Sequence, residues 1–326
     1  KLLESFFMEN VKRNIFLLSM AQFILLASVV TVVTYSSLVA KMMTGSTSLA
    51  TIPAATAFIA TAAFAFPASL FMKKFGRKKG FFAGTFFGFL GGLCAVLSIY
   101  LNNYYLLCFA TFSHGTYQAF ANFYRFTAME VSPPKFHKQA VSYVILGGVL
   151  AGLSAPTLAS LFEKNYFEPV QYAGTYCLVM ALSLVAFFLI SRIKLPPRVV
   201  MPTDHVPVAN PKFMDVLKRP AFICASLSAA CAYLSMSFIM TATPLEVVEV
   251  CGYQIEDAAG VIQWHSMSMF APAIITGTLI ARFSSVKMIL TGMIVMLIAT
   301  LTAKAGIELY NFYIALVFIG IGWNFM

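Results

Sequence analysis

Four polar side chains recur at helical spacing within one long apolar stretch, residues 104–130. They are His114, Gln118, Asn122 and Arg125, and they fall within roughly 80° of one another at about 100° per residue. A charge in hydrocarbon costs roughly 2.5–3.5 kcal/mol, so Arg125 is a candidate for contact with a ligand or a counter-ion. The stripe predicts a substrate-binding face turned toward a central cavity. Interhelical hydrogen bonding and, for Arg125, snorkelling to the membrane surface are the competing interpretations.

A second polar group lies in the stretch 257–281. Gln263, Trp264 and His265 are adjacent there, and Trp264 is roughly 12 Å deep if it lies about eight helical residues beyond the acidic loop. At that depth a tryptophan and a histidine could stack against a planar substrate, although helix packing would also explain them. Gln22 and Asn324 are weaker candidates for substrate binding in the first and last apolar stretches.

Coupling to protons would need a titratable group near the membrane interior. No acid lies in the middle of an apolar stretch, so the sequence leaves Glu130 or His265 for this role. Glu130 ends the stretch that contains Arg125, and we predict that Arg125 holds Glu130 ionised until a proton releases it. Both Glu130 and Glu246 could instead mark helix ends.

Enzyme and metal chemistry find no support in the sequence. It contains no HExxH or GxSxG motif, no phosphate-binding glycine loop with lysine, and no CxxC pair among its six cysteines. We therefore expect no enzyme activity, no cofactor, no metal site, no zinc and no disulfide.

The elements that must position these side chains are membrane-spanning helices. Of 326 residues, 60% are hydrophobic and 10% are charged, and the mean hydropathy is +0.83, which fits no soluble chain. A spanning helix needs about 20 apolar residues, and unbroken apolar runs exclude an outer-membrane barrel. The sequence predicts an all-α polytopic membrane protein with ten spans, at 14–40, 48–72, 80–101, 104–130, 139–162, 170–191, 220–246, 257–281, 286–305 and 309–326.

The distribution of lysine and arginine predicts the orientation of these spans. If the N-terminus is cytoplasmic, eighteen of the 22 basic residues lie in inner loops, three in outer loops, and Arg125 within a span. The net charge of +10 is then a topology signal and does not indicate nucleic-acid binding. We expect a monomer in the inner (cytoplasmic) membrane, with the lipid bilayer, a small-molecule substrate and protons as its partners.

The segment 192–219 contains five prolines and divides six spans from four. It predicts an N-terminal six-helix bundle at 1–191, a cytoplasmic linker at 192–219 and an incomplete C-terminal bundle at 220–326. Lys74-Phe75-Gly76 also matches Arg282-Phe283-Ser284 at an offset of 208 residues. This repeat predicts that two further helices and half of another are absent, and that the natural chain runs on to about 400 residues.

The loop that contains Gly76 carries a family motif. The segment 69–78 reads SLFMKKFGRK and resembles the loop 2–3 signature of the major facilitator superfamily. Ser69 replaces that signature's first glycine and Lys73 its acid. The resemblance implies two six-helix bundles that rock around a midplane site, and it implies gating roles for Ser69, Lys73, Gly76, Arg77, Lys78 and, in span 5, Pro156.

Three further stretches resemble a poorly characterised bacterial branch of that superfamily, and one resembles its drug:proton antiporters. The first three are residues 124–128, 263–277 and 320–325; the last is the glycine-proline segment 147–160. The resemblance implies a secondary transporter of a small organic molecule, driven by protons, with efflux favoured over import. An importer of a metabolite or a siderophore-like compound is the alternative, and a membrane receptor or an intramembrane enzyme is a remote one.

Overall fold

The protein is a bundle of long helices. The computed structural model describes residues 2–164, 172–195 and 213–326, and no strand occurs in this part of the chain. Seven of the helices in these ranges are long and apolar enough to cross a membrane. The elements are α1 (Leu2–Thr44), α2 (Thr47–Ala50), α3 (Ile52–Phe75), α4 (Arg77–Tyr100), α5 (Tyr104–Ala121), α6 (Tyr124–Glu130), the 3-10 helix η1 (Pro134–Phe136), α7 (His137–Lys164), α8 (Ala173–Arg192), α9 (Phe213–Leu217), α10 (Pro220–Leu245), the π-helix η2 (Glu246–Val250), α11 (Ile255–Phe270), α12 (Ala273–Phe283), α13 (Ser285–Ala305) and α14 (Leu309–Phe325).

Each predicted span corresponds to one helix or to two helices end to end, and the all-α polytopic fold is confirmed. Three spans are divided between two helices, and the first of them, span 2, is divided into α2 and α3 at Thr51. Span 4 is divided into α5 and α6 at Asn122 and Phe123, and span 8 into α11 and α12 at Ala271 and Pro272, where proline has no N–H to donate. Residues 196–212 of the predicted linker lie outside the described residues.

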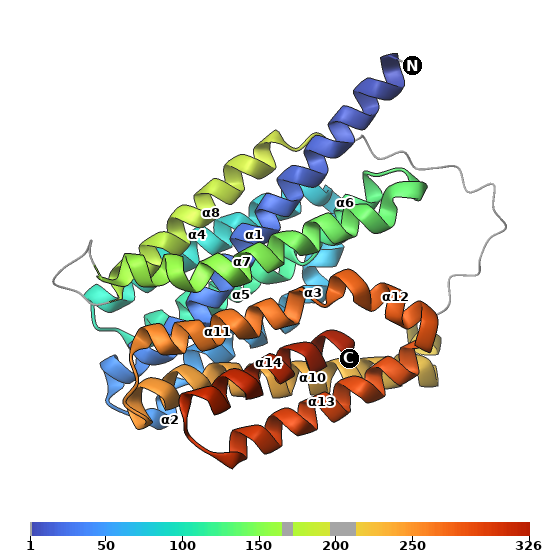
Figure 1. Cartoon of the computed structure of the whole chain (residues 1–326). Coiled ribbons are helices and arrows are strands. Elements are labelled where there is room, and N and C mark those ends of the chain that lie inside the picture. The colour runs from blue at the N-terminus through green and yellow to red at the C-terminus, as the bar shows by residue number, and fades with distance from the viewer. Residues whose placement is uncertain (1, 165–171, 196–212) are drawn as a thin grey trace.

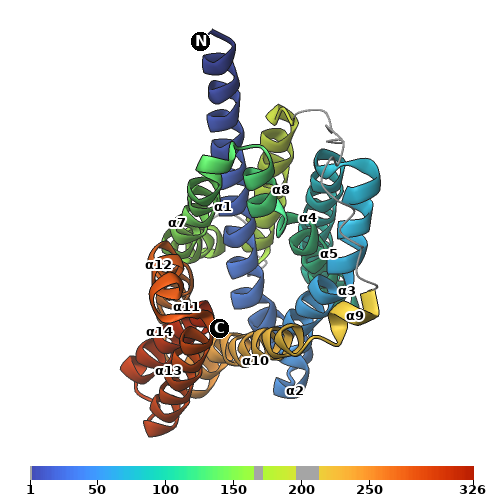
Figure 2. The same ribbon diagram turned by 90° about the vertical axis from the view of Figure 1, so that its right-hand side faces the viewer.

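Helix α1 runs through the middle of the bundle and contacts α7, α8, α5 and α10 (Figures 1 and 2). Close approach depends on glycine at two places along α7. A side chain at Gly147 would clash with the Ser19 carbonyl of α1, and a Cβ at Gly152 would lie 3.0 Å from the Met267 nitrogen of α11. The glycine-proline segment of span 5 therefore packs against helices from both halves of the sequence.

The two halves of the sequence meet mainly at the end of the bundle that holds α2 and η2. Tyr35 and Leu38 of α1 share a buried cluster with Leu245 of α10, and the Ser37 hydroxyl donates to the Thr241 carbonyl (3.4 Å). At the opposite end of α10, the side chains from 220 to 227 are exposed. The contacts thus close one end of the interface between the halves.

The loop repeat has a structural counterpart. Gly76, between α3 and α4, has φ 93° and ψ 156°, and Ser284, between α12 and α13, has φ 81° and ψ 153°. These two positions are the ones that the offset of 208 residues pairs. Both loops therefore turn through the same backbone conformation, which normally requires glycine.

Candidate functional site

Arg125 lies just after the break in span 4. Helix α5 ends at Ala121, and Asn122 and Phe123 have turn geometry before α6 begins at Tyr124. The side chain of Arg125 is exposed, and its guanidinium lies 5.1 Å from the centre of the Phe126 ring. A cation over an aromatic face is held in place while its remaining N–H groups stay available to a ligand.

Arg125 faces a residue of the other half of the sequence. Its positive charge acts on the hydroxyl of Tyr233, which belongs to α10. Tyr233 is 47% exposed, so part of its ring is accessible.

Two further aromatic rings lie in a row with Tyr233. Tyr233 meets Trp323 of α14 edge to face, with ring centres 5.4 Å apart and planes at 77°. Trp323 in turn meets Phe270 of α11 at 6.3 Å and 73°. We call Arg125, Tyr233, Phe270 and Trp323 the arginine–aromatic site. It combines ring surfaces with one guanidinium, so it could hold a flat molecule and donate hydrogen bonds to its polar edge.

The predicted stripe on span 4 is not one continuous cavity face. His114 is buried at 2% exposure, packs edge to face on Tyr117, and has no hydrogen-bond partner for either ring nitrogen among the described residues. Gln118 accepts a hydrogen bond from the Thr61 hydroxyl of α3 (3.2 Å). Asn122 is half-buried at the helix break. In this structure His114 packs against Gly91 of α4 while Arg125 is exposed beyond the break, and substrate contact by His114, Gln118 and Asn122 stays a prediction.

Most of the polar side chains predicted around span 8 make hydrogen bonds to other helices. His265 is fully buried, and its Nδ1 pairs with the Leu316 carbonyl of α14 (2.8 Å), while the Gln263 amide donates to the Leu153 carbonyl of α7. Trp264 is 54% exposed. Asn324 accepts from Thr276 (2.6 Å) and donates to the Met269 carbonyl (2.7 Å), beside the break at Pro272. Substrate contact by these four residues stays a prediction.

Glu130 has a different partner from the predicted one. Its carboxylate receives two hydrogen bonds from Arg77, one from Nη2 and one from Nε at 3.1 Å. The expected Arg125–Glu130 pair is absent from the described structure. Arg77 also lies over the Phe123 ring at 5.1 Å, so this one side chain ties the α3–α4 loop to the break and the end of span 4.

The other predicted gating residues are spread over this end of the bundle and α7. Ser69 is half-buried and Lys73 exposed near the end of α3, and Pro156 is buried within α7. Lys78 donates to the Ser191 and Ile193 carbonyls (2.7 and 2.8 Å), at the end of α8. Gln22 is half-buried on α1. Their part in gating or binding stays a prediction.

Sequence reasoning missed Tyr233 and Phe270 and gave Trp323 no role. Trp323 is one of only two tryptophans in the chain, and its position in an apolar run was the signal that could have identified it. Tyr233 gave no such signal, because fourteen tyrosines are present and only the packing of α10 against α14 brings it to Trp323. Among the described residues, no group of histidine, cysteine, aspartate or glutamate could hold a metal ion.

Comparison with known proteins gives a consistent result. The family model for the Major Facilitator Superfamily matches residues 15–326. Riboflavin transporter RfnT of Brucella anthropi is 30% identical over 314 residues, which cover 96% of this chain and 78% of that protein. The uncharacterised MFS-type transporter YdeG of Bacillus subtilis is 24% identical, covering 96% and 76%.

The fold also matches solved structures. A bacterial homologue of the human lysosomal transporter Spinster, in an inward-facing and unoccupied conformation, superposes with a TM-score of 0.66 at 15% identity. The match covers 97% of this chain and 73% of that one. At this level of identity the likeness concerns the fold alone.

Proposed function

Because this chain belongs to the Major Facilitator Superfamily, we propose that it carries a planar, flavin-like molecule across the membrane by alternating access. The protein is a multi-pass membrane transporter and not an enzyme. The observation that carries the substrate proposal is the arginine–aromatic site, in which the charge of Arg125 acts on Tyr233 of the other half, and Tyr233 adjoins the rings of Trp323 and Phe270. The riboflavin transporter RfnT, at 30% identity, supports the same class of substrate.

The chemistry of a flavin suits this site. Its fused ring system is flat and aromatic, so it can pack against the aromatic surface that Tyr233, Phe270 and Trp323 form. The carbonyl oxygens on one edge of the flavin accept hydrogen bonds. A planar guanidinium can donate to two such acceptors together, which a lysine ammonium does less well.

The place where the halves are joined supports a mechanism of alternating access. In this structure they are packed together around Tyr35, Leu38 and Leu245, while α10 is open at its other end. With the proposed orientation, the closed end is the outer one and the site opens to the cytoplasm. Rocking of the halves would then break the contacts at the outer end and close the inner one around the substrate.

We further propose that transport is coupled to protons and directed outward. Within the described spans, His265 is enclosed by protein and bonded to a carbonyl, which leaves Glu130 as the candidate proton carrier. Protonation of Glu130 would weaken its ion pair with Arg77 and free the α3–α4 loop from the end of span 4. The antiporter-like segment of span 5 supports the outward direction.

Riboflavin binding should depend on Trp323 far more than on Trp264. In purified protein, Trp323→Ala should weaken binding about tenfold, because it removes ring packing as well as buried area. Trp264→Ala is the matched control, since it removes the second of the two tryptophans at an exposed position. Quenching of riboflavin fluorescence measures both affinities. An affinity of Trp323→Ala equal to that of the parent would show that the rings do not form the site.

Vesicle transport completes this test. Purified protein in inside-out proteoliposomes should move radiolabelled riboflavin into the lumen faster when the lumen is more acidic than the outside. Protons that leave the lumen would then drive riboflavin inward. A rate that is unchanged when the gradient is collapsed would disprove the coupling. Transport of another metabolite with none of riboflavin would disprove the substrate proposal and leave the family unaffected.

Cys251 offers a test of the proposed orientation. It is a free, half-buried thiol directly after η2. Burial, together with the negative charges of Glu246 and Glu308, raises the pKa of the Cys251 thiol. Because the thiolate is the reactive form, labelling of intact cells by an impermeant maleimide should be slow near neutral pH and rise about tenfold per pH unit below that pKa.

The matched probe sits at the other end of the bundle. In a Cys251→Ser background, Lys79→Cys should be labelled only after the cells are permeabilised, because Lys79 is exposed at the predicted cytoplasmic end. Labelling of Lys79→Cys in intact cells, with none of Cys251 in the parent, would reverse the proposed orientation.

A further inference from the structure

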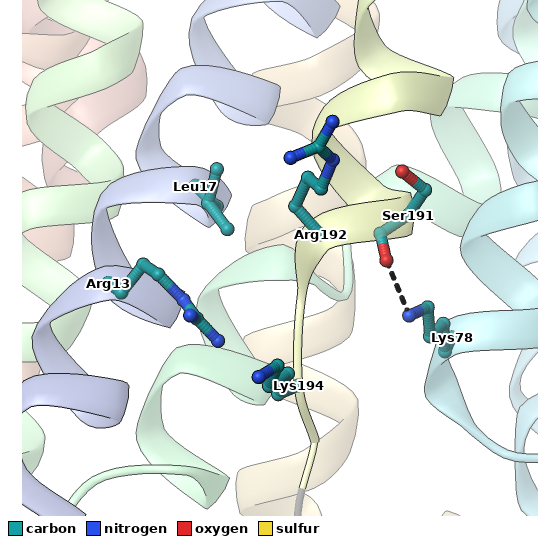
Figure 3. A pocket seen from close by; sticks show the side chains of 6 residues that line it. All are labelled: Arg13, Leu17, Lys78, Ser191, Arg192 and Lys194. Atoms are coloured by element: carbon teal, nitrogen blue, oxygen red, sulfur yellow. Dashed lines mark hydrogen bonds between the residues drawn. The ribbon is translucent and has the colours of Figure 1, made fainter. Parts of the chain in front are cut away.

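A basic cavity lies at the predicted cytoplasmic end of the first half, away from the arginine–aromatic site. It has a volume of about 630 Å³ and lies where α1, the start of α4 and the end of α8 meet. Figure 3 shows the six side chains that line it, and four of them are cations. The lining residues are Arg13, Leu17, Lys78, Ser191, Arg192 and Lys194.

The backbone on one side of this cavity is fixed in place. The side-chain amide of Asn14 donates to the Lys194 carbonyl (2.7 Å) and accepts from the Lys194 N–H (3.1 Å). Lys78 caps the end of α8 through the carbonyls of Ser191 and Ile193. Because Asn14 of α1 and Lys78 of α4 both make hydrogen bonds to residues 191–194, this side of the cavity is ordered without a ligand.

Exposed cations border the cavity on the side where α8 ends. Ile193 is extended, at φ −69° and ψ 128°, and its side chain is buried at 1% exposure. Ile193 packs into the core, while its neighbours Arg192 and Lys194 are exposed and line the cavity. Figure 3 shows both beside the cavity, with Arg13 approaching from α1.

Four cations line the cavity, and no acid is among the described lining residues. The Lys78 ammonium is engaged by two carbonyls, but neither interaction cancels its charge. Arg13, Arg192 and Lys194 are exposed, so their N–H groups are accessible to a ligand. All four cations attract an anion in the cavity, so the cavity is suited to a ligand with concentrated negative charge.

We propose that this cavity binds a phosphate-bearing anion, with Arg13, Arg192 and Lys194 as its main contacts. Arginine forks match the oxygens of a phosphate, and lysine adds a point charge. The cavity lies at the end of membrane-spanning helices, where the headgroups of anionic phospholipids are found. The ligand is therefore a phospholipid headgroup or a soluble phosphorylated compound. This inference concerns α1, α4 and α8, and it does not depend on the proposed substrate.

Lipid binding by purified protein tests the proposal. The triple variant Arg13→Gln/Arg192→Gln/Lys194→Gln removes three cavity charges, and Lys73→Gln/Arg282→Gln/Lys287→Gln removes three exposed charges at the same end of the bundle. Delipidated protein would be titrated with phosphatidylglycerol or phosphatidylcholine in mixed micelles, and separately with inorganic phosphate. We expect phosphatidylglycerol to bind the parent and the control more tightly than it binds the cavity variant, by about fivefold for each charge removed.

The two sources of phosphate give different results. Saturable binding of inorganic phosphate that phosphatidylglycerol does not displace, lost in the cavity variant alone, would identify a soluble ligand. Equal binding of every anion by the cavity and control variants would overturn the proposal. If the triple variant does not fold, Arg192→Lys serves instead: it keeps the charge but loses the fork, so weaker phosphatidylglycerol binding supports the proposal and unchanged binding refutes it.

Discussion

Replacing Arg125 by lysine should lower riboflavin transport by about ten- to a hundredfold, although the charge is kept. A hydrogen bond to a charged group contributes roughly 1.5–3 kcal/mol, and lysine cannot reproduce the paired donors of the guanidinium. Arg125 is exposed beside the Phe126 ring and acts on Tyr233 of the opposite half. Arg125→Ala should transport no better than Arg125→Lys. Initial rates of uptake in proteoliposomes, at equal amounts of folded protein, measure both variants.

Two controls separate a binding role from simple anchoring at the membrane surface. Lys79→Ala removes an exposed cation of α4 and should leave transport unchanged. Glu130→Gln should not rescue Arg125→Ala, because the partner of Glu130 is Arg77. If Arg125→Lys transports as well as the parent, the residue only snorkels to the surface, and the arginine–aromatic site loses its charged member.

The spans could be predicted from sequence because each one is specified locally. A run of about 20 apolar residues has a single stable state in a bilayer, whatever it packs against. The turn at Gly76 was predictable for the same reason, since glycine permits a conformation that other residues avoid. These features need no knowledge of neighbouring helices.

The site could be predicted only in part because it depends on helix breaks and on partners distant in sequence. The stripe on span 4 assumed a straight helix, and the interruption at Asn122 and Phe123 separates Arg125 from His114. Nδ1 of His265 is hydrogen-bonded to the Leu316 carbonyl of α14. Periodicity indicates which side chains lie on the same face of a helix, but it does not indicate which neighbouring helix covers that face.

The same limit explains the exchange of partners at Glu130. Arg125 lies five residues from Glu130 in the sequence and in the same span, but the turn at Gly76 brings Arg77 of the earlier α3–α4 loop to the carboxylate. An exposed pair of this kind contributes little to stability, about 0–1 kcal/mol. Its importance would lie in transport, because the pair joins two segments that a rocking motion must move relative to one another.

Substitutions at Gly76 and Ser284 should change stability in opposite directions. Both residues adopt a conformation that is essentially restricted to glycine, and such strain costs roughly 1–3 kcal/mol in another residue. Gly76→Ala should therefore lower the unfolding temperature by several degrees. A Cβ at Gly76 would meet no atom within 4 Å, so the loss would come from the backbone and not from a clash.

Ser284→Gly should raise the unfolding temperature, because it relieves the same strain in the loop that the repeat pairs with Gly76. The serine side chain makes no capping hydrogen bond that glycine would forfeit, although the greater freedom of glycine in the unfolded chain offsets about 0.5–1 kcal/mol of the gain. Thermal unfolding in detergent compares both variants with Gly45→Ala, another glycine with positive φ (66°) and open space around it. At Gly45 the φ is one that alanine tolerates better, so the loss should be smaller than at Gly76. A lower unfolding temperature for Ser284→Gly would mean that Ser284 is not strained, and that the two loops do not share the backbone requirement inferred from their common offset.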